Sequence, residues 1–208
     1  MSYKLVVFDF DGTLADTFPW FLRNFDRAAE RFGFDRLDRA NAAALRGLDA
    51  RAILRHHRVP LWKVPAIARF MRARMAEDIA EIALFAGMDE TLESLAERGC
   101  QLAVVSSNTI ANVRAVLGPA NAQRIRHYEC GASLFGKARR LRRVLAASGV
   151  APANAILVGD ELRDGDAARE AGIAFAAVAW GYTRADALAA HGADLTFASV
   201  AKLAAALA

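Results

Sequence analysis

The sequence predicts an α/β protein in which a doubly wound parallel sheet carries an inserted all-helical segment. Short apolar runs that are continuous rather than alternating recur along the chain, which is typical of parallel strands covered by helices on both faces. Amphipathic stretches of helical length separate most of these runs. The interval 17–85 breaks the alternation, because it contains helical patterns and no convincing strand.

The first predicted strand is Leu5–Phe8, and the helical interval follows it directly. Thr17 is a candidate N-cap with Pro19 in the first turn, and Pro65–Leu84 reads as one long helix. We therefore expect two domains, an α/β core formed by residues 1–16 and 86–208 and a small helical cap formed by residues 17–85.

The rest of the chain alternates between helices and strands. The later strands are expected at Leu102–Val105, Ile156–Val158 and Ile173–Val178. The helices are expected at Glu90–Arg98, Ala111–Leu117, Lys137–Ser148 and Arg163–Ala171, with an Ala-rich helix over 201–208. Each strand is short enough, and each helix long enough, for a compact doubly wound sheet.

Composition excludes several classes of protein. With 208 residues and 55% hydrophobic side chains, the chain can bury a core without disulfides, so Cys100 and Cys130 are expected to be reduced thiols. No apolar run approaches the ~20 residues of a membrane span and no signal peptide is evident, so a cytoplasmic protein without membrane contact is expected. The net charge is only +4. The densest basic run has the spacing of a solvated helix face, so no nucleic-acid partner is expected; it comprises Lys137, Arg139, Arg140, Arg142 and Arg143.

Polar side chains follow three of the predicted strands at the point where each strand ends. They are Asp9 and Asp11 after the first, Ser106, Ser107 and Asn108 after the second, and Asp160 and Asp164 after the third. In an open parallel sheet the ligand crevice lies outside these carboxyl ends, so residues distant in sequence converge there.

The segment Asp9-Phe10-Asp11-Gly12-Thr13 places two carboxylates where an apolar strand stops and a glycine permits a sharp turn. Two acids in one crevice repel each other unless a cation lies between them or one is protonated. A hard divalent cation such as Mg²⁺ and a protonated acid both suit phosphoryl transfer. The simpler interpretation is a pair of turn-forming aspartates.

Four motifs in order resemble those of the haloacid dehalogenase (HAD) superfamily of phosphatases, and the resemblance covers nearly the whole chain. They are Asp9–Thr13, Ser106 after its apolar strand, Lys137 at a helix start, and Gly159-Asp160 with Asp164. Trp180-Gly181-Tyr182 resembles a stretch of the phosphoglycolate phosphatase-like branch. This resemblance implies a Rossmann-like core and a phosphoric monoester hydrolase.

The resemblance also implies a role for each motif residue. Asp9 is expected to attack phosphorus and form an aspartyl-phosphate, with Asp11 as general acid and then general base. Mg²⁺ would be held by Asp9, the Asp11 backbone carbonyl and Asp160. Lys137 would neutralise charge, and Asp164 would support Lys137 or the metal. A phosphoryl oxygen would accept a hydrogen bond from Ser106, or equally from Ser107 or Asn108, since a strand-end serine is ordinarily a turn former.

The helical interval resembles the cap that this family inserts after its first motif, with hinges expected near Ala15–Thr17 and Phe85–Gly87. Cap residues expected to contact the substrate, a small phosphorylated metabolite, are Arg46, Gly47, Arg51 and His56. Each of these is also compatible with a solvated cap surface, and His56 beside His57 resembles a surface pair. The chain is expected to be a monomer or a homodimer.

Four alternative functions remain open. A phosphomutase would use the same acids, whereas a 2-haloacid dehalogenase would have little use for Asp11, because a halide leaves without a proton. A phosphonate hydrolase would require a cap lysine, and the cap offers Lys63. A non-catalytic protein that binds a phosphorylated ligand would not need to keep Asp9, Asp11, Lys137 and Asp160 intact.

Overall fold

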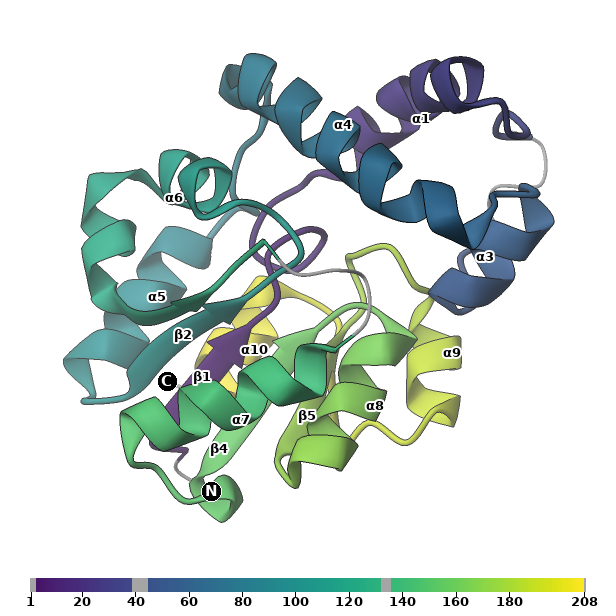
Figure 1. The fold of residues 1–208 in the computed structure, drawn as a ribbon. Helices are drawn as coiled ribbons and strands as arrows, with labels where there is room; N and C mark the ends of the chain where they lie inside the picture. The colour runs from purple at the N-terminus through teal and green to yellow at the C-terminus, as the bar shows by residue number, and fades with distance from the viewer. Residues whose placement is uncertain (1–2, 39–44, 132–135, 208) are drawn as a thin grey trace.

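The computed structural model describes residues 3–38, 45–131 and 136–207 and contains one six-stranded sheet (Figure 1). The strand order is β3-β2-β1-β4-β5-β6 and each described pairing is parallel. The strands are β1 Leu5–Phe8, β2 Gln101–Val105, β3 Ile125–Glu129, β4 Ala155–Gly159, β5 Ala174–Val178 and β6 Leu195–Phe197. The predicted doubly wound parallel sheet is confirmed.

Helices cover both faces of this sheet. Alternate side chains of β1 point to opposite faces, so that Val6 and Phe8 pack in one apolar core while Leu5 and Val7 pack in the other. The first core is closed by α5 Met88–Glu97, α6 Ile110–Arg124 and α10 Val200–Leu207. The second is closed by α7 Lys137–Ser148, α8 Leu162–Ala171 and α9 Ala185–Ala190.

The described part of the interval 17–85 is helical, as expected. Its elements are α1 Phe18–Phe32, α3 Ala50–His56, the short 3₁₀ turn η1 Leu61–Lys63, α4 Val64–Glu77 and the 3₁₀ turn η2 Ile79–Glu81. Figure 1 shows α1, α3 and α4 grouped at the top of the molecule, away from the N-terminus. We call this group the cap helices.

The two linkers that join the cap helices to the sheet run side by side. The Asp16 amide donates to the Ala83 carbonyl, and the Phe85 amide donates to the Leu14 carbonyl. Ala15 and Leu84 form an antiparallel bridge between them. The chain therefore enters and leaves the cap helices through one narrow backbone connection close to the end of β1.

Two local predictions were wrong. The helix expected over Pro65–Leu84 ends at Glu77, and the Asp78 carboxylate just beyond it accepts hydrogen bonds from Trp20 and Arg74. Strands β3 and β6 were missed because β3 carries charged and polar side chains and β6 is only three residues long. The C-terminal helix was predicted as far as residue 208, which lies outside the described residues.

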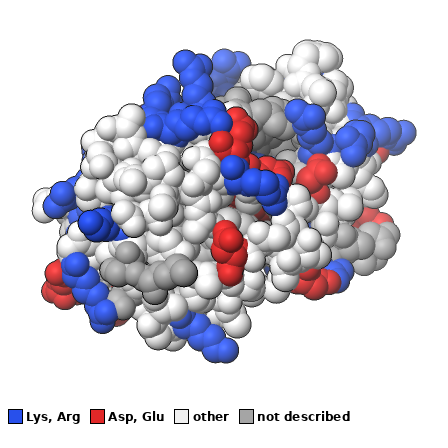
Figure 2. All heavy atoms as spheres, turned by 90° about the horizontal axis from the view of Figure 1, so that it is seen from below, with Lys and Arg blue, Asp and Glu red and all other residues white. Residues whose placement is uncertain are grey.

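The solvated face predicted for the basic run on α7 holds for Arg139, Arg142 and Arg143, which are exposed, whereas Lys137 is buried and was wrongly included. Arg142 pairs with Glu170 at 3.1 Å, and Arg143 pairs with Glu129. On the face that Figure 2 shows, Lys and Arg side chains lie in separate groups with acidic side chains between them.

A search of the described helices found none with the length and apolar character needed to cross a bilayer.

Candidate active site

The predicted site residues meet because three neighbouring strands end at the same edge. Asp9 follows β1, Ser106 follows β2 and Asp160 follows β4, and β1 lies between the other two strands. Lys137 reaches the same point from the start of α7. Its Nζ lies 3.0 Å from Asp9 Oδ2 and 2.6 Å from Asp164 Oδ1.

Asp9 is only 2% exposed and is poorly satisfied. Its Oδ2 is buried without a hydrogen-bond partner, although the Lys137 ammonium forms an ion pair with it at 3.0 Å. Burial raises the pKa of Asp9 to about 6, against the opposing effect of the Lys137 ammonium. A buried carboxylate oxygen with an open coordination direction is suited to a cation or an electrophile.

Asp160 is fully buried and is held from two sides. Thr13 Oγ1 donates to Oδ1 at 2.7 Å, and the Tyr182 amide donates to Oδ2 at 2.7 Å. A Cβ on Gly181 would lie 2.3 Å from the Asp160 Cβ, so this position requires glycine. Burial, followed by the charge of Glu161, raises the pKa of Asp160 well above its usual range.

Oxygen atoms of three buried carboxylates, Asp9, Asp160 and Asp164, lie within 4.8 Å of one another. Lys137 is the nearest cation, and its single charge does not balance three carboxylates. Oxygen-only ligands and the unpartnered Asp9 Oδ2 fit a hard divalent cation such as Mg²⁺. Two contacts were considered for Asp164, with Lys137 or near the metal, and its carboxylate both pairs with Lys137 and lies beside Asp9 and Asp160.

Lys137 is buried at the first residue of α7, where a positive charge is disfavoured by the helix dipole. Burial alone would lower the pKa of its ammonium, but Asp164 and Asp9 outweigh that effect and raise it overall. Asp164 also accepts from the Glu161 amide at 3.1 Å, which caps α8. The ammonium is thus kept charged and fixed between two carboxylates.

Asp11 lies one step further from the strand and faces a different set of groups. Asn108 Nδ2 lies 3.2 Å from its Oδ1 and 3.3 Å from its Oδ2. Burial, followed by the charge of Asp9, raises the pKa of Asp11 to about 7. The two acids therefore differ in environment, since Asp9 contacts a lysine and Asp11 contacts an amide.

The residues after β2 line the same crevice in different ways. Ser106 is 1% exposed, and its Oγ accepts from the Asn108 amide at 3.0 Å, so its own hydroxyl hydrogen remains available for donation. Asn108 is oriented by Asn112, which donates to Asn108 Oδ1 at 3.0 Å. The Ser107 carbonyl accepts a hydrogen bond from Arg72 Nη1 of α4 at 3.0 Å, and this contact links the sheet to the cap helices.

Of the four cap residues selected from the sequence, Arg46 reaches the core. Its Nε donates to the Tyr182 carbonyl at 2.9 Å and its Nη2 donates to the Gly181 carbonyl at 2.6 Å. The Arg46 guanidinium also lies over the Phe18 ring, 5.1 Å from its centroid. Gly47 is half-buried, whereas Arg51 and His56 are exposed.

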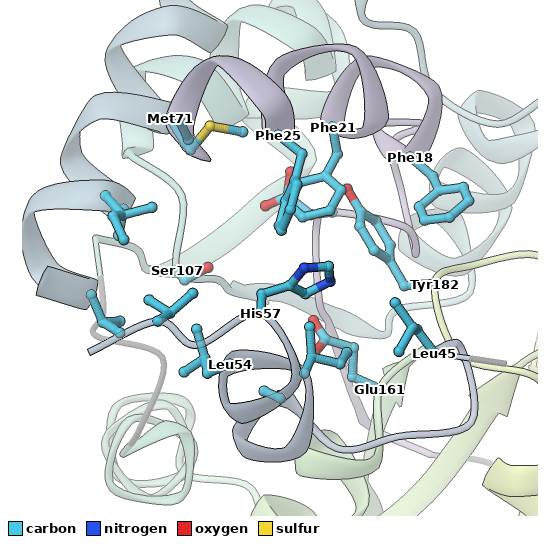
Figure 3. A pocket seen from close by; sticks show the side chains of 18 of the residues that line it. Phe18, Phe21, Phe25, Leu45, Leu54, His57, Met71, Ser107, Glu161 and Tyr182 are labelled. Carbon is cyan, nitrogen blue, oxygen red and sulfur yellow. The ribbon is translucent and has the colours of Figure 1, made fainter. Parts of the chain in front are cut away.

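A cavity of about 320 Å³ lies between the cap helices and the ends of the strands (Figure 3). Asp11, Ser107 and Asn108 line one part of it, and most of its remaining lining is apolar. The apolar side chains include Phe18, Phe21, Phe25, Leu45, Leu54 and Met71. Arg51 and His56 are not among the lining residues, whereas Arg46 is.

His57 corrects the interpretation of a surface histidine pair. It is 2% exposed and lines the cavity, while its neighbour His56 is exposed. Figure 3 shows the His57 ring among the apolar side chains of the cavity. The sequence contained no signal for this difference, because both histidines lie next to each other at the end of α3.

Other residues of the site were not assigned from the sequence. Thr13 and the Tyr182 backbone hold Asp160, and Trp180 Nε1 donates to the Thr13 carbonyl at 3.1 Å. Tyr182 OH lies 3.0 Å from Thr17 Oγ1, which explains why Thr17 does not cap α1 through its side chain. Thr13 was visible as the last residue of the first motif, but its hydrogen bond to Asp160 was not.

A doubly wound sheet with buried carboxylates and a lysine at the carboxyl ends of its strands, beneath inserted helices, is an arrangement suited to phosphoryl transfer. Residues 6–178 match the model of the haloacid dehalogenase-like hydrolases. The chain belongs to this family.

The relatives of the chain include a phosphatase and a protein kinase. It is 31% identical over 180 residues to a phosphoglycolate phosphatase of Synechococcus elongatus, and the aligned region covers 86% of this chain and 85% of that protein. It is also 31% identical over 191 residues to the tyrosine-protein kinase PtkA of Mycobacterium tuberculosis, covering 89% of this chain and 65% of the kinase. The solved structure of a predicted phosphatase from Clostridium acetobutylicum shares the fold with a TM-score of 0.83 at 18% identity, covering 99% and 98% of the two chains. The chain is thus a HAD-like phosphatase with relatives in the phosphoglycolate phosphatase-like branch.

Proposed function

We propose that the protein is a Mg²⁺-dependent hydrolase of small phosphate monoesters that acts through an aspartyl-phosphate on Asp9. The observation that carries the proposal is the buried Asp9 carboxylate, which has an unpartnered oxygen beside Lys137 and lies within the carboxylate cluster. A group held in this way is a nucleophile in a fixed position. The relationship to phosphoglycolate phosphatases supports the same chemistry.

The cation would be held by the carboxylates of Asp9 and Asp160 and by the Asp11 backbone carbonyl, with Asp164 beside them. When bound, Mg²⁺ neutralises charge on the attacking carboxylate and on the phosphoryl oxygens. Thr13 and the Tyr182 amide orient Asp160 for this role. Lys137 adds a second, fixed positive charge next to Asp9.

In the first step, an Asp9 carboxylate oxygen forms a bond to phosphorus while the bond between phosphorus and the ester oxygen breaks. Asp11 gives its proton to the departing alcohol, and its pKa of about 7 leaves a substantial protonated fraction at neutral pH. Ser106 would donate its hydroxyl hydrogen to a phosphoryl oxygen, and this role is supported by a hydroxyl oxygen that accepts from the Asn108 backbone amide.

In the second step, the Asp11 carboxylate takes a proton from water, and the water oxygen bonds to phosphorus. The bond between phosphorus and Asp9 breaks, which releases inorganic phosphate and restores both acids. Asn108 steadies Asp11 through both steps, because its amide contacts the Asp11 carboxylate and is itself fixed by Asn112. Arg46 contributes by joining the cap segment to the 181–182 backbone beside Asp160.

The direct test is hydrolysis of p-nitrophenyl phosphate with and without Mg²⁺, measured as free inorganic phosphate. We expect turnover that requires the cation. Turnover that continues in excess chelator, or no turnover with Mg²⁺, would contradict the proposal. Release of one inorganic phosphate for each p-nitrophenol also distinguishes a hydrolase from a phosphomutase, because a mutase returns the phosphoryl group to a sugar or another acceptor.

A further inference from the structure

The cavity above the active site is polar at one end and apolar over most of its walls. It is continuous with the proposed phosphate site, since Asp11, Ser107 and Asn108 are part of its lining. Away from these residues its walls are mostly aromatic and aliphatic side chains of α1, α3 and α4. A cavity of about 320 Å³ is within the usual range for binding an organic ligand.

Among the described residues, each cation that lines the cavity already has a partner. Arg46 donates to two backbone carbonyls, and Arg72 donates to the Ser107 carbonyl at 3.0 Å. Arg163 forms an ion pair with Glu161 at 2.6 Å. The carboxylate that phosphoglycolate carries beside its phosphate would enter a mostly apolar space. Arg46 and Arg72 are held by backbone carbonyls, which do not neutralise their charge, so burying this carboxylate would be costly unless it drew one of them away from its present contacts.

His57 adds one specific polar feature to this apolar space. Its Nδ1 lies 3.2 Å from the Asp35 carbonyl oxygen, which can only accept, so Nδ1 carries the hydrogen of that bond. Burial lowers the pKa of His57, which favours the neutral ring. In that tautomer Nε2 is an acceptor, and it is buried without a hydrogen-bond partner.

Resting on the proposed function, we propose that the substrate is a phosphate monoester with a bulky apolar leaving group, which fills the cavity and carries one hydroxyl or N–H that donates to His57 Nε2. The phosphate would lie among Asp9, Asp11 and Ser106, and the hydrocarbon part would lie against Phe21, Phe25 and neighbouring apolar side chains. Apolar contact supplies affinity, and the one hydrogen bond supplies orientation.

The substrate part of the test uses three phosphate monoesters in the presence of Mg²⁺, namely phosphoglycolate, benzyl phosphate and 3-hydroxybenzyl phosphate. We expect kcat/KM for benzyl phosphate to exceed that for phosphoglycolate by about tenfold or more. 3-Hydroxybenzyl phosphate should be better still. His57→Phe, which keeps an aromatic ring and removes the acceptor, should bring the ratio of kcat/KM for 3-hydroxybenzyl phosphate to that for benzyl phosphate close to one.

A matched pair of variants tests the cavity itself. Leu54→Trp fills the cavity from α3 and should lower the ratio of kcat/KM for benzyl phosphate to that for phosphoglycolate by about tenfold. Leu61→Trp places the same side chain at an exposed cap position outside the lining and should leave this ratio unchanged. If Leu54→Trp does not fold, inhibition of the wild-type protein by benzylphosphonate against phosphonoacetate provides the same comparison, and benzylphosphonate should bind more tightly.

The outcomes separate the inference from the function on which it rests. Hydrolysis of the esters with phosphoglycolate preferred, or phosphonoacetate as the tighter inhibitor, would overturn the apolar-substrate inference and leave the phosphatase proposal intact. No Mg²⁺-dependent hydrolysis of any ester would overturn both. A hydroxyl advantage that survives in His57→Phe would remove His57 from the proposal.

Discussion

The hydrogen bond from Thr13 to Asp160 offers a sensitive test of how the carboxylate cluster is built. Both side chains are fully buried, and the donor and acceptor oxygens are 2.7 Å apart. Thr13→Val keeps the shape of the side chain and replaces the hydroxyl by a methyl group. Asp160 Oδ1 then loses its donor inside the protein, which costs about 2 kcal/mol.

For a chain of this length, about 2 kcal/mol corresponds to a decrease of about 4–8 °C in Tm. Differential scanning calorimetry in the presence of a chelator measures this decrease. Calorimetric titration with Mg²⁺ measures the affinity of the variant for the cation. Because Thr13 orients a proposed ligand, Mg²⁺ affinity should fall by about 10–100-fold. Thr196→Val, at an exposed position on β6, is the matched control and should match the wild type. If Thr13→Val and the control had the same Tm and the same Mg²⁺ affinity, the buried hydrogen bond would have no role in the site.

Three further predictions concern the acids. Asp9→Asn should reduce phosphate release by about 10⁴-fold or more, with an unchanged circular dichroism spectrum, because the nucleophile is lost and the fold is not; retained turnover would refute the assignment. Asp11→Asn should let phosphoenzyme accumulate with a good leaving group such as p-nitrophenol, as detected by mass spectrometry after acid quenching, because attack by Asp9 survives and water activation does not. Mg²⁺ should raise Tm more at about pH 8 than at about pH 5. The pKa of Asp9 is raised to about 6 in the folded protein, so the metal-free fold loses stability as pH rises from the ordinary carboxyl range through that value. The cation offsets this loss only when Asp9 is ionised. An equal or larger effect of Mg²⁺ at the lower pH would contradict the cause given for that pKa.

The central strands and the motif residues could be predicted because their signals are local. Leu5–Phe8 is a continuous apolar run in the middle of the sheet, buried on both faces, and its predicted bounds are those observed. The residue after such a strand lies at the carboxyl ends of the parallel strands, so the positions of Asp9 and Asp160 followed from the strands that precede them. The edge strands β3 and β6 lacked this signal, because an edge strand is half-covered and tolerates polar residues.

The sequence by itself therefore determined the central strands, the inserted helices and the convergence of the strand-end acids, since these depend on periodicity and on where apolar runs stop. The position of Lys137 beside them was implied by the resemblance to the family's motifs. Tertiary structure alone decided the contents of the cavity. Whether Arg46 meets a ligand or the 181–182 carbonyls depends on packing against residues more than a hundred positions away. Whether His56 or His57 is buried depends on contacts that His57 makes with Phe25 and Asp35. Side-chain burial and partner choice are set by that packing, and no local pattern at residues 46–57 records it.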